Sequence, residues 1–302
     1  GAAGVSTIYG FQNVGGKINY AMNDRYVAEL GFAFSGSDNY AEGNRWGFYP
    51  AVSAAWIVSN ESFFDSEAIG FLKLRLSGGK SGNDQFSGGR YLYQGYYVSG
   101  GQFNTGIGDI QGQTGLIQPY VPNAEIFAEE SMKYNAGIDT RLFDRIDFSV
   151  DAFVDKRSGI IAQDFSLSAL FGAAPPYGNI GEVTNKGFEV SVDYRHTVGG
   201  LTYFASALGS YNSNTIDYMA EVITVPGAAR TGNAIGSAFG LQADGFYQVE
   251  DFNPDGTLAS GLPTPGFGAV QPGDIRYVDI NGDNTIDQQD EIVIGNPYLP
   301  KF

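Results

Sequence analysis

The chain has 302 residues and a formal net charge of −16, from 33 acidic and 17 basic side chains, which argues against nucleic-acid binding. It has no cysteine and one histidine, which excludes disulfides and cysteine zinc sites and disfavours a His-centred site. No stretch approaches the ~20 continuous apolar residues of a membrane helix. The first residues, GAAGVSTIYG, and the last, GNPYLPKF, look like interior cuts, so we expect a segment of a longer protein.

Alternation of apolar and polar residues recurs along the chain and predicts β-strands. In RIDFSVDAFVDK, for example, Ile146, Phe148 and Val150 share one face, while Asp147 and Asp151 share the other. In chain order, the expected strands cover residues 17–23, 25–36, 47–58, 70–79, 131–142, 145–157, 186–197 and 200–212. The predicted fold class is all-β and antiparallel.

The connections between these strands alternate in length. Short turns are expected at residues 23–25, 143–144 and 198–199, with a medium one at 59–70. Long loops are expected at residues 37–46, 80–130, 158–185 and 213–295, and the last three are the expected extracellular loops. Short turns on one side and long loops on the other are typical of an outer-membrane barrel. A soluble β-sheet with an aromatic core is the alternative.

The two faces of the expected strands differ in a way that bears on this choice. Aromatic residues gather near strand ends, as in the girdles of membrane barrels; they are Tyr20, Tyr26, Phe48, Trp56, Phe143, Tyr194, Tyr203 and Tyr211. The polar faces carry charge, at Lys73, Arg75, Asp147, Asp151, Glu189 and Asp193. Charge in the filled core of a small barrel would be costly, so the pattern favours a wide lumen.

Four motifs, in order along the chain, resemble one known family. They are RYVAELGFAFSGSDNYAEGNRWGFYPAVSAAWIVSNESFF from Arg25, LKLRLSGGKSGND from Leu72, NIGEVTNKGFEVSVDY from Asn179 and PGDIRYVDINGDNTIDQQDEIVIGNP from Pro272. Together they resemble the barrel segment of the SusC/RagA-type TonB-linked outer-membrane transporters. The resemblance is internal, since that family's signal peptide, TonB box, plug domain and final barrel strands have no counterpart in this sequence.

This resemblance implies a function in import. Such transporters form a 22-stranded barrel with an N-terminal plug. It implies a nutrient cargo, such as a glycan or an oligopeptide, and a SusD-like surface lipoprotein as partner. It also implies energy supplied through TonB and a place in the outer membrane of a Gram-negative, Bacteroidota-like cell.

The acidic stretch near the end of the chain has the ligand spacing of a calcium loop. Relative positions 1, 3, 5, 7, 9 and 12 are Asp279, Asn281, Asp283, Thr285, Asp287 and Asp290. Asn284 replaces the usual glycine at position 6, Asp290 replaces the usual glutamate, and flanking helices are not evident. The loop is therefore a candidate for structural calcium, with Ile286 as its apolar anchor. A plain turn, in which Asp and Asn side chains bond their own backbone, is the alternative.

One aromatic stretch is a candidate for substrate contact. Within GGRYLYQGYYVSGGQF, four tyrosines could stack on sugar rings or hold a peptide: Tyr91, Tyr93, Tyr96 and Tyr97. No catalytic residues are predicted, because Asp147 and Asp151 lie ~13 Å apart along one strand, too far for a glycosidase pair. A soluble all-β carbohydrate-binding or adhesion module with a calcium loop is the alternative function.

Overall fold

The computed structural model describes residues 8–295 apart from residues 87, 106–110, 168–169 and 171–173. The chain divides into two compact units, Gly1–Ala220 and Glu221–Phe302, which are considered separately. Among the described residues, no helix is both long and apolar enough to cross a membrane.

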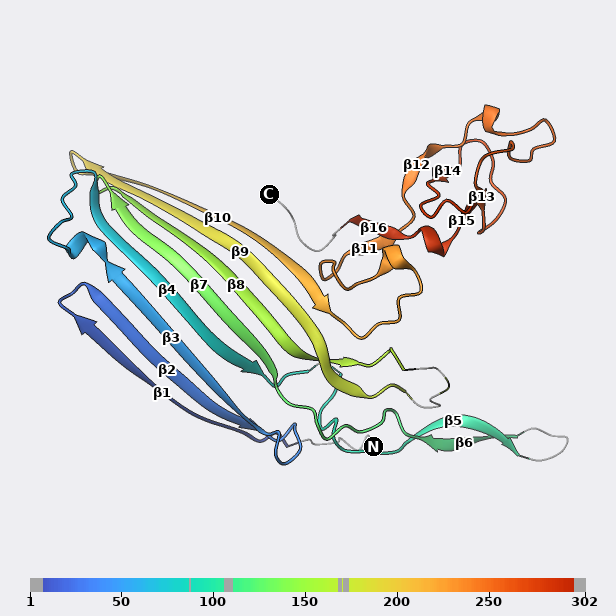
Figure 1. Ribbon diagram of the computed structural model, residues 1–302, viewed down its shortest axis with the longest axis horizontal. Coiled ribbons are helices and arrows are strands. Elements are labelled where there is room, and N and C mark those ends of the chain that lie inside the picture. The colour runs from blue at the N-terminus through green and yellow to red at the C-terminus, as the bar shows by residue number, and fades with distance from the viewer. Residues whose placement is uncertain (1–7, 87, 106–110, 168–169, 171–173, 296–302) are drawn as a thin grey trace. The chain divides into compact units, whose positions relative to one another are not determined.

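The first unit is built on one antiparallel sheet of eight strands, ordered β1-β2-β3-β4-β7-β8-β9-β10 (Figure 1). The strands are β1 (Phe11–Met22), β2 (Tyr26–Ser37), β3 (Trp46–Ile57), β4 (Ile69–Asn83), β7 (Glu129–Leu142), β8 (Ile146–Gln163), β9 (Tyr177–Val198) and β10 (Leu201–Tyr218). Neighbouring strands of this sheet follow one another along the chain, except that β5 and β6 intervene between β4 and β7. The sheet is therefore a simple up-and-down meander.

The connections separate by length to the two ends of this sheet, as the sequence predicts. At the turn end, β1–β2 and β7–β8 are joined by tight turns in which Asn23, Asp24, Phe143 and Asp144 all have φ between 50° and 55°. Two successive residues in this left-handed region match the twist of a two-strand hairpin. At the opposite end, which we call the loop end, residues 38–45, 84–128 and 164–176 connect the strands.

The register places apolar and charged residues on opposite faces of the sheet. Leu30 lies opposite Val52, and Val150 lies opposite Val190, on what we call the apolar face. Leu30 and Leu76 of this face remain 60% and 63% exposed. The opposite side of the sheet, which we call the polar face, carries the polar and charged residues of the strands. Exposed leucines on a water-soluble body would be costly, so this face is suited to hydrocarbon.

Aromatic pairs mark two levels of the apolar face on the same two strands. At the turn end, Tyr26 of β2 stacks on Trp56 of β3 with ring centroids 6.4 Å apart. Near the loop end, Phe34 stacks on Trp46 at 4.8 Å. Tyr26 and Phe34 are eight residues apart, which is about 27 Å of extended strand. This spacing fits the two aromatic girdles that border the apolar band of a membrane barrel.

The buried core of this unit lies among the loops and not against the centre of the sheet. Its buried members are Tyr40, Leu92, Tyr120, Ile126 and Ile161, and Phe86, Ala128 and Tyr177 pack against them. All come from the loop end, five of the eight from residues 84–128. The long loops are therefore packed on one another.

Several strands run further toward the loop end than the alternation predicts. β8 continues to Gln163 and β9 starts at Tyr177, so the loop expected at 158–185 shrinks to 164–176. β10 likewise continues to Tyr218. The reason is that backbone pairing continues beyond the apolar band; Lys156 still pairs with Thr184, and Arg157 with Val183. Where both faces of a strand are polar, the sequence shows no apolar–polar alternation and does not predict this pairing.

Two regions expected as loops contain strands of their own. Within 80–130, β5 (Val98–Thr105) pairs with β6 (Gln111–Ile117) as a separate hairpin. The second unit falls within the loop expected at 213–295, and it folds on itself through short pairs. Its strands are β11 (Ala238–Gly240), β12 (Ala243–Phe246), β13 (Thr264–Pro265), β14 (Ile275–Tyr277), β15 (Thr285–Ile286) and β16 (Ile292–Gly295). Single 3-10 turns occur at η1 (Val58–Asn60), η3 (Pro226–Ala228), η4 (Val249–Asp251) and η5 (Gln288–Asp290).

Candidate functional site

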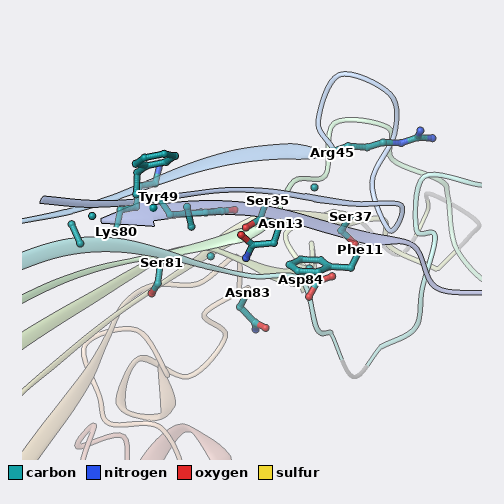
Figure 2. A pocket seen from close by; sticks show the side chains of 18 of the residues that line it. Phe11, Asn13, Ser35, Ser37, Arg45, Tyr49, Lys80, Ser81, Asn83 and Asp84 are labelled. Atoms are coloured by element: carbon teal, nitrogen blue, oxygen red, sulfur yellow. The ribbon is translucent and has the colours of Figure 1, made fainter. Parts of the chain in front are cut away.

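A recess of about 530 Å³ lies on the polar face where β1 to β4 approach the loop end (Figure 2). Its labelled lining residues are Phe11, Asn13, Ser35, Ser37, Arg45, Tyr49, Lys80, Ser81, Asn83 and Asp84. Alternate residues of β1 and β2 reach it because they share the polar face. Hydroxyl, amide and charged groups lie beside apolar surface in this lining, which suits a ligand that has several hydrogen-bonding groups.

The wall of this recess is held by a cluster of ionic and aromatic contacts. The Tyr9 hydroxyl donates a hydrogen bond to Asp84, and the Arg90 guanidinium lies 4.4 Å from the centre of the Tyr9 ring. Arg90 also pairs with Asp38 at 3.3 Å. Burial, and then the bond to Asp84, raises the pKa of Tyr9 to about 12. Tyr9 therefore stays a neutral donor at physiological pH, and the cluster ties the start of β1 to the long loop.

The four tyrosines proposed for substrate contact occupy different environments. Tyr91 has a φ of 57° and bonds Asp38 at 3.2 Å, so it belongs to the wall cluster. Tyr93 packs edge-on against Tyr91, and Tyr96 packs edge-on against buried Tyr120. Tyr97 is 70% exposed. Substrate contact by these side chains stays a prediction, and Tyr97 is the best placed of the four to make it.

An arginine on the polar face holds three strands together in a way that sequence reasoning missed. Arg75 of β4 bonds Asp139 of β7 with contacts of 2.7 and 2.8 Å. The same guanidinium bonds Asp151 of β8 at 3.1 and 2.9 Å. Bidentate pairs of this kind combine strength with fixed geometry. Lys73, Arg75 and Arg141 thus form ion pairs between strands of the polar face.

At the turn end, a single glutamate joins two hairpins. Glu61 follows β3 and accepts hydrogen bonds from Trp56 at 3.0 Å, from Arg25 at 3.2 Å and from the Tyr26 hydroxyl. The bond from Tyr26, then that from Trp56, lowers the pKa of Glu61. Tyr26 begins β2 and Arg25 directly precedes it, more than thirty residues before Glu61. The sequence shows a glutamate in a turn but carries no signal for these partners.

The acidic loop of the second unit is held by bonds from its own backbone. Asp279 accepts from the amides of Gly282 at 2.7 Å and Asn284 at 2.8 Å. Asn281 and Asp283 each accept from the amide two residues on. Asn284 has a φ of 65°, which supplies the left-handed turn expected at this position. These are Asx turns, the alternative weighed for this motif.

Asp290 closes the loop from its far end. Its side chain is fully buried and accepts from the amides of Ile280 at 2.8 Å, Asn281 at 3.2 Å and Asp287 at 2.9 Å. Burial pushes the pKa of Asp290 upward, but these backbone donors outweigh it and hold the pKa below its usual range. Ile286 is 1% exposed, which confirms it as the apolar anchor.

The geometry bears on the calcium hypothesis without testing it. Thr285 and Asp287, at positions 7 and 9, belong to the same loop, and Asp287 accepts from the amide of Gln289 at 2.7 Å. In the described part of the chain, no group of three or more His, Asp or Glu side chains is arranged to hold a metal ion. Calcium binding at Asp279, Asn281, Asp283, Thr285, Asp287 and Asp290 stays a prediction.

Comparison with known proteins gives one family for nearly the whole chain. The family described as TonB dependent receptor-like, beta-barrel matches residues 4–296. A TonB-dependent receptor P3 of Formosa agariphila is 29% identical over 96% of this chain and 29% of that protein. The TonB-dependent receptor SusC of Bacteroides thetaiotaomicron is 26% identical over 93% of this chain and 28% of that protein. The chain thus spans less than a third of these curated relatives.

Solved structures give the same architecture. A chain of the RagAB peptide importer in its open-open state superposes with a TM-score of 0.70, at 18% identity, over 95% of this chain and 29% of that chain. The closed-closed state gives a TM-score of 0.68 over 95% of this chain and 30% of that chain. At this identity the likeness concerns the fold, in which the eight-stranded sheet is a partial barrel.

Proposed function

Since the chain belongs to the TonB-dependent receptor β-barrel family, we propose that the full-length protein imports a nutrient across the outer membrane. The observation that carries this proposal is the two-faced sheet, which has an exposed apolar face and an opposite face that carries the charged residues. Closing such a sheet would turn the apolar face to lipid and the polar face to a wide lumen. The family consists of receptors and not enzymes, so binding and passage are the activities to derive.

The proposed cargo is an oligopeptide or a glycan. The RagAB importer is described as a peptide transporter, and its likeness to this chain supports the peptide alternative. The relative named SusC is a second member of the same family, so the family is not limited to the RagAB importer. The recess on the polar face supports either cargo, because its hydroxyls, amides and Asp84 offer donors and acceptors beside the rings of Phe11 and Tyr49.

The proposed partners act at opposite ends of the barrel. A SusD-like lipoprotein would cover the loop end, which the described parts of residues 38–45, 84–128 and 164–176 form. The packed core of Tyr40, Leu92 and Tyr120 supports this role, because it gives the loops a firm surface. Coupling to TonB is proposed for the whole protein, since this chain spans less than a third of the curated relatives it matches.

The alternative of a soluble carbohydrate-binding or adhesion module fits the structure poorly. A water-soluble sandwich seals its apolar faces between two sheets. Here Ile18, Phe48 and Val52 of the apolar face are 71%, 55% and 53% exposed. Such a continuous apolar surface marks contact with a membrane or a partner.

Deletion of the gene in its host tests the proposal. Uptake of defined peptide and glycan mixtures is compared between the wild type, the deletion strain and a strain lacking TonB. We expect both mutants to lose uptake of the same cargo class, and the protein to fractionate with the outer membrane. Uptake that survives loss of TonB, or a protein found in the soluble fraction, would overturn the proposal.

A further inference from the structure

Two lysines end the apolar face toward the loop end. On β8 the apolar residues Ile146, Phe148, Val150, Ala152 and Val154 are followed on the same face by Lys156. On β9 the apolar residues Tyr194, Val192, Val190 and Phe188 are followed by Lys186. The β8 run covers about 27 Å of strand, which at the usual tilt of a barrel rises roughly 20 Å. Both lysines therefore lie at the border between hydrocarbon and headgroups.

The two lysines are neighbours, and neither forms an ion pair with a described residue. Lys186 lies opposite Val154, and Lys156 lies opposite Thr184, so the two side chains are diagonal neighbours roughly 7–8 Å apart. Both are exposed. Among the described residues, no carboxylate lies within 4 Å of either ammonium group; nearby Glu130 bonds Lys80 at 2.5 Å. Glu130 is thus engaged by Lys80, and Asp217 accepts a hydrogen bond from Thr184, so neither neighbouring carboxylate forms an ion pair with Lys156 or Lys186.

A recess in the apolar face begins directly below this pair. It has a volume of about 620 Å³ and is lined by Val52, Ala54, Leu76, Gly78, Tyr134, Ala136, Ala152 and Val154, with the strand backbone as its floor. Val154, which lies opposite Lys186, forms its edge. Small residues at Gly78, Ala136 and Ala152 leave the hollow between larger neighbours. The cationic pair and the apolar hollow thus meet on β8, where Val154 precedes Lys156 by two residues on the same face.

We propose that this surface binds a phosphorylated glycolipid, the lipopolysaccharide of the outer leaflet. Lys156 and Lys186 hold one lipid phosphate between them, and one acyl chain lies in the recess. Two adjacent ammonium groups match a phosphate in charge and reach. The leaflet follows from the loop end, which faces the outside in barrels of this kind. This inference rests on the proposed outer-membrane function.

Binding is measured with the full-length protein, purified free of lipid in detergent. Wild type, K156Q/K186Q and the matched control K133Q are titrated with lipopolysaccharide and with its dephosphorylated form. Lys133 is an exposed lysine of β7 on the polar face, opposite Asp155. We expect the double variant to bind about thirtyfold more weakly, at about fivefold for each lysine, and the control to match the wild type. Wild type should bind the dephosphorylated form as weakly as the double variant binds lipopolysaccharide.

Two further binding measurements separate loss of charge from loss of folding and lipopolysaccharide from other anionic lipids. K156R/K186R keeps both charges and should bind like the wild type, which separates lost charge from lost folding. Phosphatidylglycerol should bind wild type at least tenfold more weakly than lipopolysaccharide. The inference is overturned by equal binding of the double variant, by an equal loss in K133Q, or by phosphatidylglycerol binding as tightly. Outer-membrane location and cargo uptake are scored in parallel, so intact uptake with lysine-independent binding rejects this inference alone.

Discussion

Arg75 of β4 and Asp151 of β8 form a two-bond ion pair although β7 runs between their strands. The pair spans this distance because the intervening residue on the polar face is Gly137. A Cβ atom at Gly137 would lie 2.5 Å from the Asp151 carboxylate and 2.8 Å from the guanidinium of Arg75. The glycine thus provides the space in which the two charged groups meet.

Gly137→Ala should therefore weaken the sheet. The added methyl group displaces the charged pair, and overpacking of this kind costs about 1–3 kcal/mol. The measurement is urea unfolding of the full-length protein in detergent. Gly209→Ala on β10 is the matched control, because a Cβ there meets nothing within 4 Å. Equal stability of the two variants would remove the special role of Gly137.

The hydrogen bonds that Glu61 accepts join the two hairpins at the turn end, and we predict that their contribution to stability depends on pH. Its folded pKa is lowered by Tyr26 and Trp56, so the stability it contributes is present above the unfolded pKa of about 4.3. That contribution is lost as the pH falls through the lower, folded pKa. Melting temperature is measured from pH 7 down to pH 3. We expect Glu61→Gln to lower it most at neutral pH and to converge with the wild type in acid.

The control for this prediction is Glu67→Gln, which changes an exposed glutamate in the same connection. It should leave the pH profile unchanged. A profile of Glu61→Gln that runs parallel to the wild type at every pH would show that the ionised carboxylate does not hold the two hairpins together.

Asp290 should matter more to the acidic loop than any exposed acidic residue in it. Removing it leaves three amides without their acceptor, at a cost of about 2 kcal/mol or more. Hydrogen exchange of residues 279–291 in the full-length protein is the readout. We expect Asp290→Ala to speed exchange about thirtyfold or more, and Asp283→Ala, which frees the Thr285 amide, to have a smaller effect.

The calcium hypothesis is checked by repeating this exchange with calcium and with a chelator. Bound calcium would slow exchange across the loop, and Asp283→Ala at position 5 would abolish that slowing. Exchange that is the same in both solutions would leave the Asx turns as the whole account of the motif.

Tyr97 should contribute to cargo binding. Its ring is 70% exposed in the connection between β4 and β5, so truncation removes contact area without disturbing packing. We expect Tyr97→Ala to weaken binding of the imported cargo about fivefold or more, a typical loss for an aromatic contact residue. Tyr203→Ala is the control, because Tyr203 is 51% exposed but lies near the turn end. Unchanged cargo affinity in Tyr97→Ala would exclude this tyrosine.

The sequence was sufficient to predict the eight strands of the sheet but not their outer ends. Alternation is required where one face meets lipid, which is why the sequence assigns residues 146–154 to two faces. Beyond Lys156 no such demand remains, yet the backbone still pairs. The hairpin of β5 and β6 was missed for the same reason, since its glycine-rich sequence carries little alternation.

Site geometry depended on register, which alternation alone does not give. The pattern placed Arg75 and Asp151 on the polar face, but only the pairing of β4 with β7 and of β7 with β8 brings them together. Glu61 likewise acquires Tyr26 through the turn between strands. The residue spacing of the acidic loop fits both a turn and a metal site. Spacing alone therefore could not predict that its side chains bond the loop's own backbone amides.

The most direct test of the whole account asks which way the side chains of one strand face. The chain has no cysteine, so single cysteines at Val190, Ser191 and Val192 can be spin-labelled in the full-length protein reconstituted in lipid. Accessibility is then measured to oxygen, which concentrates in lipid, and to a water-soluble nickel chelate. We predict that labels at 190 and 192 respond to oxygen and the label at 191 to nickel. Labels at 190 and 192 that are shielded from both reagents, as between two stacked sheets, would contradict the account.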